Sequence, residues 1–206
     1  MKALFVEQSR SRTLLAALAA AGRVLLLLAV LALFVLRFGF YGILVEGDSM
    51  ETNYHTDDGV LVVRQDSIFT RGFVRFSRGD VVIIKIDEDT NYIKRIVAVG
   101  GDTLIFRKRA AADGRQVVDL YLNGEVQAEA YIREPMTTDN NTFKDVTMDT
   151  DIKVPAGYYF CMGDNRNHSM DSRDASVGFI AYGQLLGEVL TTLKPHSLLR
   201  WYYFRG

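Results

Sequence analysis

An apolar segment dominates the N-terminal part of the chain. From Thr13 to Val45, the only charged residues are Arg23 and Arg37. A helix needs roughly 20 apolar residues to cross the hydrocarbon core of a bilayer, so the segment predicts one transmembrane helix. A span over residues 24–45 places Arg23 at one interface and Arg37 near the other, whereas a span over 14–36 buries Arg23. We therefore favour the span over 24–45.

The charges that precede this span indicate how it crosses the membrane. Lys2, Arg10, Arg12 and Arg23 are opposed by a single acidic residue, Glu7. Because an excess of Lys and Arg stays on the cytoplasmic side, the N-terminus is predicted to lie in the cytoplasm. The sequence thus predicts a single-pass protein of the cytoplasmic membrane whose remaining chain is extracytoplasmic.

A cleavable signal peptide is the alternative to a permanent anchor. The small residues at 19–22 resemble a cleavage site, but the longest apolar run follows them instead of preceding them. We therefore divide the chain into a cytoplasmic N-terminus with its anchor, residues 1–45, and an extracytoplasmic catalytic domain, residues 46–206.

Beyond the anchor, short apolar runs are separated by Gly, Asp and Asn, without a sustained helical period. This pattern predicts a mostly β domain, because the runs have strand length and are rich in Val, Ile, Leu and Tyr. Asn123-Gly124 predicts a tight hairpin, since both central residues of a type I′ turn need a positive φ. The polar stretch 130–151 predicts a loop. The expected strands are 59–64, 80–86, 92–99, 103–107 and 117–122.

Charge and cysteine content exclude several classes of function. The net charge is -1 and no run of Lys and Arg is present, which argues against nucleic acid as a partner. The single cysteine, Cys161, cannot form an intramolecular disulfide, and its apolar neighbours predict a buried strand thiol. No His, Cys or acidic cluster has the spacing of metal ligands, so we expect neither a metal nor another cofactor.

Two separate residues are candidates for a nucleophile and its base. Ser49 follows the end of the predicted span by a few residues. Lys94 belongs to a strand-like run in which it shares a face with Tyr92 and Ile96. An amine between apolar groups loses hydration, which lowers its pKa and allows it to accept a proton from a serine hydroxyl. A snorkelling lysine on an edge strand is the alternative.

A third segment, Gly-Asp-Asn-Arg-Asn-His-Ser-Met-Asp-Ser-Arg at residues 163–173, follows the apolar run 158–162. Loops of such composition commonly carry function. Within it, Asp171 and Arg173 are expected to form an ion pair, and the Ser169 hydroxyl to hydrogen-bond the amine of Lys94.

In this order, the three segments resemble the bacterial type I signal peptidases, which are serine proteases with a Ser/Lys dyad. Residues 45–50 resemble the nucleophile box, 92–102 the lysine box and 163–173 the Gly-Asp-Asn-Arg signature, while 120–124 and 154–162 also match. The resemblance implies a membrane-tethered catalytic domain built mostly of antiparallel β-sheet. It also implies that the substrates are exported preproteins with small residues at the first and third positions before the cut.

The resemblance assigns roles to individual residues. Ser49 attacks the scissile carbonyl, Lys94 takes its proton, Ser169 orients Lys94, and Asp171 with Arg173 holds the site together. It also implies that Arg95, Gly163, Asp164, Asn165 and Arg166 support the site. The residues expected to bind the substrate or its oxyanion are Gly47, Asp48 and Met50.

The chain departs from the family pattern at three places. Thr52, Asn53 and Tyr54 stand where the family has Pro-Thr-Leu, and the run Gly-Gly-Asp at 100–102 replaces Pro-Gly-Asp. Gly47 stands where some members have a serine that binds the oxyanion, which leaves the backbone N–H of Ser49 as the expected donor.

Three other functional hypotheses compete with a signal peptidase. A triad of His168, Ser169 and Asp171 is disfavoured because adjacent residues point in different directions. A self-cleaving repressor with the same chemistry needs a DNA-binding region where this chain has an apolar span. A non-catalytic relative that serves as an assembly chaperone is expected to lack Ser49 or Lys94.

The lipid bilayer is an expected partner of the domain as well as of the anchor. Phe38, Phe40, Tyr41 and the aromatic residues within 68–76 form a candidate apolar edge that rests on the membrane.

Overall fold

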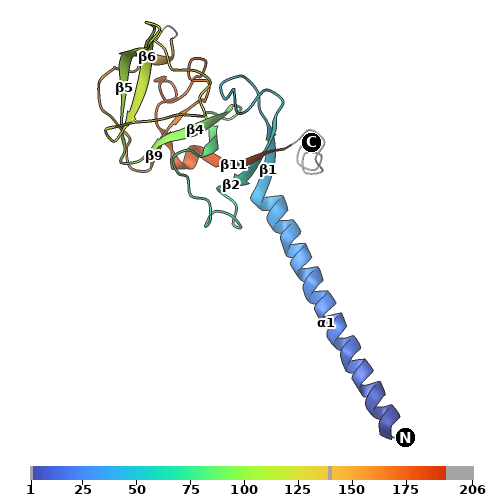
Figure 1. Cartoon of the computed structure of the whole chain (residues 1–206). Helices are drawn as coiled ribbons and strands as arrows, with labels where there is room; N and C mark the ends of the chain where they lie inside the picture. Colours follow the sequence, from blue (N-terminus) through green and yellow to red (C-terminus); the bar gives the residue numbers. More distant parts are fainter. Residues whose placement is uncertain (1, 139–140, 194–206) are drawn as a thin grey trace.

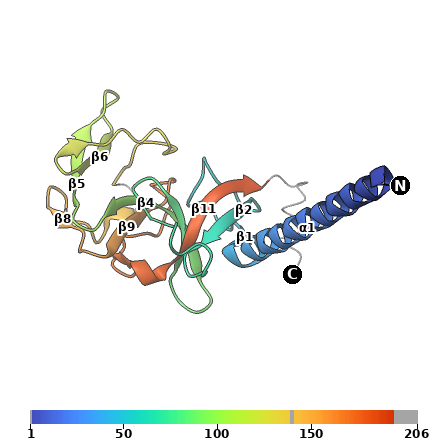
Figure 2. The same cartoon turned by 90° about the horizontal axis from the view of Figure 1, so that it is seen from below.

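The computed structural model describes residues 2–138 and 141–193. Its N-terminal helix α1 (Lys2–Gly39) is 38 residues long and projects as a straight rod from one end of the β domain in both views (Figure 1, Figure 2). Its apolar part, Leu15–Gly39, is long enough to cross a bilayer, and almost all of it is exposed, with only Gly39 buried against the domain. The prediction of one long apolar helix is confirmed.

The helix ends earlier than the span over 24–45 required. It stops at Gly39, and the next residues form strand β1 (Phe40–Leu44), which pairs antiparallel with β2 (Gly59–Arg64). A Cβ on Gly39 would lie 2.9 Å from Thr70 Cγ2, so this glycine allows the chain to turn closely against the domain. The preferred span was therefore wrong at its C-terminal end, where apolar residues belong to the sheet.

The larger sheet has seven strands, all antiparallel to their neighbours, in the order β1-β2-β11-β3-β4-β9-β10. Strand β11 comes from the end of the described chain and lies between β2 and β3, two strands that are far earlier in sequence. The remaining strands are β3 (Val81–Lys85), β4 (Asn91–Val99), β9 (Tyr158–Met162), β10 (Ile180–Ala181) and β11 (Leu185–Leu193).

A second sheet of four antiparallel strands has the order β7-β6-β5-β8. Its long hairpin β5-β6 lies at the end of the domain that is opposite α1 (Figure 1, Figure 2). Its strands are β5 (Thr103–Ala110), β6 (Gln116–Leu122), β7 (Glu125–Val126) and β8 (Ile152–Lys153). Two short 3-10 helices lie outside the sheets: η1 (Asn141–Phe143) precedes β8, and η2 (Tyr182–Gln184) connects β10 to β11.

The strand pattern is confirmed where the apolar runs were dense. The five expected strands correspond to β2 through β6 with bounds that differ by a few residues. Asn123 and Gly124 have φ values of 53° and 89° between β6 and β7, as the expected hairpin requires. Cys161 is a buried free thiol in β9. Strands β1, β8, β10 and β11 were not anticipated.

The apolar core consists of three clusters, one of which includes strands of both sheets. One cluster joins Leu104 and Phe106 of β5 to Phe160 of β9, and a second joins Val82 of β3 to Ile96 of β4. Strand β4 therefore lies between packed layers, and its polar side chains must find partners within the protein.

Candidate active site

Ser49 lies in the loop that connects β1 to β2. The base of this loop is closed by two backbone hydrogen bonds, from Val45 N–H to Asp58 and from Asp57 N–H to Val45, both 2.9 Å long. Met50, the next residue, is only 1% exposed and anchors the loop in the core. The chain thereby presents Ser49 at a fixed position while its neighbours on the N-terminal side stay in solvent.

Lys94 lies in β4, opposite Val82 of β3, and is 4% exposed. Its Nζ is 2.6 Å from Ser49 Oγ and 5.1 Å from the centre of the Tyr92 ring. Burial lowers the pKa of Lys94 to about 8, although Asp171 acts in the opposite direction and Arg173 reinforces the decrease. The predicted apolar surroundings of this lysine are confirmed, and the lysine is not on an edge strand.

The segment 163–173 is held by a buried ion pair. Arg173 donates to both carboxylate oxygens of Asp171 at 2.9 and 2.8 Å, and the Gly163 N–H donates to the same carboxylate at 3.0 Å. Burial alone would raise the pKa of Asp171, but Arg173 and the hydrogen bonds from neighbouring groups together hold the pKa below its usual value. The expected contact between Asp171 and Arg173 is present, and both side chains are almost fully buried.

The same segment holds the nucleophile loop through its backbone. Asn165 donates from its N–H to the Ser49 carbonyl and from its side chain to the Asp48 carbonyl, each at 3.0 Å. Gly163 leaves room for this approach, because a Cβ there would lie 2.4 Å from the Ser49 carbonyl oxygen and 2.3 Å from Ser169 Oγ. The glycine and the asparagine of the Gly-Asp-Asn-Arg run thus fix the position of Ser49.

Asp164 connects three parts of the site. Arg95, on the strand that carries Lys94, donates to both of its carboxylate oxygens at 2.8 and 2.6 Å. Asn53 of the nucleophile loop donates to the same carboxylate at 2.8 Å and also to the carbonyl of Tyr131. Asn53 was noted only as a departure from the family pattern, but it ties the loop of Ser49 to the segment that follows β7.

Arg166 has a partner that the sequence did not reveal. Its side chain is fully buried and donates to Glu129, at 2.7 Å in one of two hydrogen bonds. Tyr131 stacks nearby, 5.7 Å from the guanidinium carbon of Arg166. An arginine is almost never fully buried unless it is paired. The residue type was thus foreseeable, but no local pattern identified Glu129 among the acidic residues.

A cavity of about 460 Å³ opens over the two central side chains. Gly47, Asp48 and Ser49 line it from the nucleophile loop, and Lys94 lines it from β4 beside Ser49. His168 also lines this cavity and is exposed. Asp171 is bonded to Arg173 and Gly163, so the structure does not assemble the alternative triad of His168, Ser169 and Asp171.

The Ser169 hydroxyl is buried beside Gly163, in the same segment as Asp171. Among the hydrogen bonds of residues 2–138 and 141–193, none joins Ser169 to Lys94. The orienting role of Ser169 therefore stays a prediction, as do the oxyanion roles of Gly47 and Ser49.

Comparison with known proteins places this geometry in a family. The family model described as "Signal peptidase, peptidase S26" matches residues 18–193. The chain belongs to the signal peptidase family. It is 33% identical to a signal peptidase I of Bacillus licheniformis over 86% of this chain and 89% of the relative. It is also 34% identical to a signal peptidase I of Bacillus amyloliquefaciens, over 87% of this chain and 86% of the relative.

Membership of the signal peptidase family establishes which class of reaction the chain catalyses. The chain is a serine peptidase, a hydrolase that removes signal peptides from preproteins. A further relative, the signal peptidase I S of Bacillus subtilis (strain 168), is 33% identical over 83% of this chain and 86% of its own length. The predicted fold class, a mostly antiparallel β domain behind one N-terminal apolar helix, is confirmed.

Proposed function

We propose that this signal peptidase is membrane-bound and cuts preproteins with a Ser49/Lys94 dyad. The observation that carries the proposal is the 2.6 Å contact between Ser49 Oγ and a lysine amine that is buried and has a lowered pKa. In its neutral form the amine accepts the hydroxyl proton, so the direction of this hydrogen bond reverses before attack.

The proposed reaction has two halves. Ser49 Oγ attacks the scissile carbonyl while Lys94 takes its proton, and the ammonium then protonates the leaving amine to give an acyl-enzyme. Water, deprotonated by the same amine, attacks the ester and releases the cleaved signal peptide. The ammonium then returns that proton to Ser49 Oγ as the ester bond breaks, so Lys94 acts in turn as base, acid, base and acid, and the enzyme returns to its starting protonation state.

The oxyanion is proposed to bind to the backbone N–H of Ser49. In the part of the chain that the structure describes, this N–H donates to no hydrogen bond, so it is free for the developing negative charge. Gly47 and Asp48 line the same cavity and give the substrate backbone access from the exposed side. The preferred substrates carry small residues at the first and third positions before the cut.

Helix α1 is proposed as the anchor, with its N-terminus in the cytoplasm and the catalytic domain extracytoplasmic. The apolar stretch Leu15–Gly39 has the required length, and the basic residues before it favour this orientation. The domain follows the helix directly through β1, so the active site is kept near the membrane surface where preproteins emerge.

The test is cleavage of a preprotein with an Ala-X-Ala site by the full chain in detergent. Ser49→Ala and Lys94→Ala should each reduce kcat/KM by a factor of 1000 or more, on the order expected for loss of a nucleophile or its base. Ser77→Ala and Lys108→Ala, both at exposed positions outside the site, are the matched controls and should cut like wild type. Cleavage by either dyad variant at the wild-type rate would refute the proposal.

A further inference from the structure

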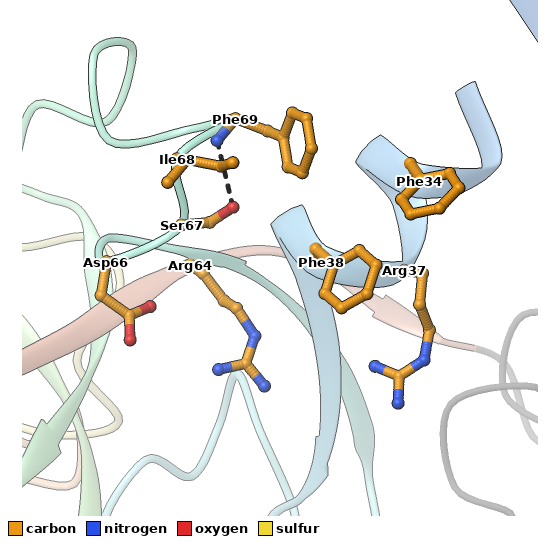
Figure 3. A pocket seen from close by; sticks show the side chains of 8 residues that line it. All are labelled: Phe34, Arg37, Phe38, Arg64, Asp66, Ser67, Ile68 and Phe69. Carbon is orange, nitrogen blue, oxygen red and sulfur yellow. Dashed lines mark hydrogen bonds between the residues drawn. The ribbon is translucent and has the colours of Figure 1, made fainter. Parts of the chain in front are cut away.

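A second cavity, of about 540 Å³, lies where helix α1 meets the domain. Figure 3 shows its walls: Phe34, Arg37 and Phe38 come from the last turns of α1, and Arg64, Ile68 and Phe69 come from the end of β2 and the segment after it. The proposed catalysis uses none of these residues.

The place of this cavity on the helix sets its depth in a membrane. The 25 residues of Leu15–Gly39 extend about 37 Å, which exceeds the roughly 30 Å of a hydrocarbon core. The C-terminal end of the helix therefore reaches the headgroup layer, and Arg37 lies two residues before that end. Phe34 is about one turn nearer the bilayer centre, so the cavity extends from the headgroups towards the acyl chains.

The cavity walls also divide into a polar part and an apolar part. In Figure 3 the guanidinium groups of Arg37 and Arg64 extend in the same direction, away from the rings of Phe34 and Phe69, and lie on either side of the ribbon that follows α1. A phospholipid has the same division, with acyl chains on one side and a phosphate on the other.

Both guanidinium groups are available for an anion. Arg37 lies 5.7 Å from the centre of the Phe38 ring and Arg64 lies 4.6 Å from that of Tyr41, and neither forms an ion pair with any residue in the described ranges. Asp66 also lines the cavity, which leaves a net charge of about +1 when all three groups are ionised. Arginine pairs with a phosphate through two parallel hydrogen bonds.

We propose that this cavity binds one anionic phospholipid of the outer leaflet. Arg37 and Arg64 hold the phosphodiester, Phe34, Phe38 and Phe69 contact the acyl chains, and Asp66 accepts a hydrogen bond from a hydroxyl of the headgroup. The proposal rests on the membrane anchoring put forward above. It adds a defined lipid site that fixes the angle between the anchor and the catalytic domain.

The neighbouring segment supports a membrane environment for this site. Ile68 is 79% exposed and Phe73 is 86% exposed, although both are large apolar side chains. Next to a spanning helix, such side chains are stabilised by contact with lipid.

The test measures which lipid stays with the full chain after reconstitution into nanodiscs of equal phosphatidylglycerol and phosphatidylcholine, followed by extraction into mild detergent and native mass spectrometry. Wild type should retain one phosphatidylglycerol. Arg37→Gln and Arg64→Gln should each reduce this retention about tenfold, as expected for loss of one arginine–phosphate contact. Arg71→Gln and Arg75→Gln, exposed arginines of the neighbouring segment, remove the same charge and should retain the lipid as wild type does.

The outcomes separate this proposal from the anchoring and from catalysis. Equal retention of phosphatidylcholine by wild type would overturn the lipid site, and so would an equal loss in the Arg71 and Arg75 controls. Arg37→Lys keeps the charge of this exposed residue and should retain the lipid at an intermediate level, which guards against a folding defect. Preprotein cleavage, measured in the same nanodiscs, reports on the proposed function independently.

Discussion

Lys94 is 4% exposed, and its amine contacts a serine hydroxyl instead of a carboxylate. Because only the neutral amine can accept the Ser49 proton, kcat/KM should rise tenfold per pH unit below about pH 8 and level off above it. A pH profile measured with a preprotein substrate checks this. A rise centred near 10.5, the ordinary value for lysine, would contradict it.

Asp171 affects the pH at which kcat/KM rises. Its carboxylate raises the pKa of Lys94, so Asp171→Asn should move the rise of kcat/KM to lower pH. The variant also leaves the buried Arg173 without its counter-charge, which should cost on the order of 3–5 kcal/mol of stability. The profile is therefore to be recorded at a temperature where circular dichroism shows the variant folded, and an unshifted or higher midpoint argues against the assignment.

Gly163 tests the close approach of two segments. A methyl group there would lie 2.4 Å from the Ser49 carbonyl oxygen, which is backbone and cannot rotate away. Gly163→Ala should displace Ser49 and lower kcat about 100-fold, the effect of a misplacement of roughly 1 Å. Gly183→Ala, where a Cβ meets no atom within 4 Å, is the control. Comparable rates for the two variants would mean that Gly163 has no positioning role.

At the scale of elements, the site depends on the segment after β7 as much as on the strands. Glu129 is the buried partner of Arg166, and its replacement by Gln leaves an uncompensated guanidinium. Glu129→Gln should lower the free energy of unfolding by about 3–5 kcal/mol, measured by urea denaturation. Asp113→Asn breaks an exposed ion pair with Arg115 and should leave the free energy of unfolding almost unchanged. A similar loss of unfolding free energy in Glu129→Gln and Asp113→Asn would show that burial of the pair Glu129–Arg166 is unimportant.

Sequence patterns predicted these elements unequally, for physical reasons. Dense runs of Val and Ile identified β2, β3 and β4, since both faces of these strands are largely buried. Strand β1 was hidden because its apolar residues continue those of α1, and hydrophobicity alone cannot separate a helix from the strand that follows it. Strand β11 was missed because Gly187 and Glu188 interrupt its apolar pattern and its register shifts against both neighbours.

The candidate site was predictable only as far as local motifs reached. Ser49, Lys94 and the segment 163–173 carry recognisable residue patterns, and the fold brings them together. Glu129 and Asn53 act through contacts across 37 and 111 positions in the sequence, which no local pattern encodes. Long-range partners of buried charges therefore required the structure.

For the whole molecule, the orientation across the membrane determines on which side the cavity of Ser49 opens. The single cysteine makes this measurable, because Cys161 is buried and burial raises the pKa of its thiol, so wild type should not react with maleimides. Lys108→Cys on β5, at the end of the domain opposite α1, should react with a membrane-impermeant maleimide in intact cells (Figure 1).

The complementary position lies near the start of α1. Ser9→Cys should react with the same reagent only after the membrane is permeabilised, because the basic residues around it stay in the cytoplasm. Labelling of Ser9→Cys in intact cells together with protection of Lys108→Cys would invert the proposed topology. The catalytic cavity would then face the cytoplasm. The proposed dyad could not meet preproteins on the outer side of the membrane, where they emerge after crossing.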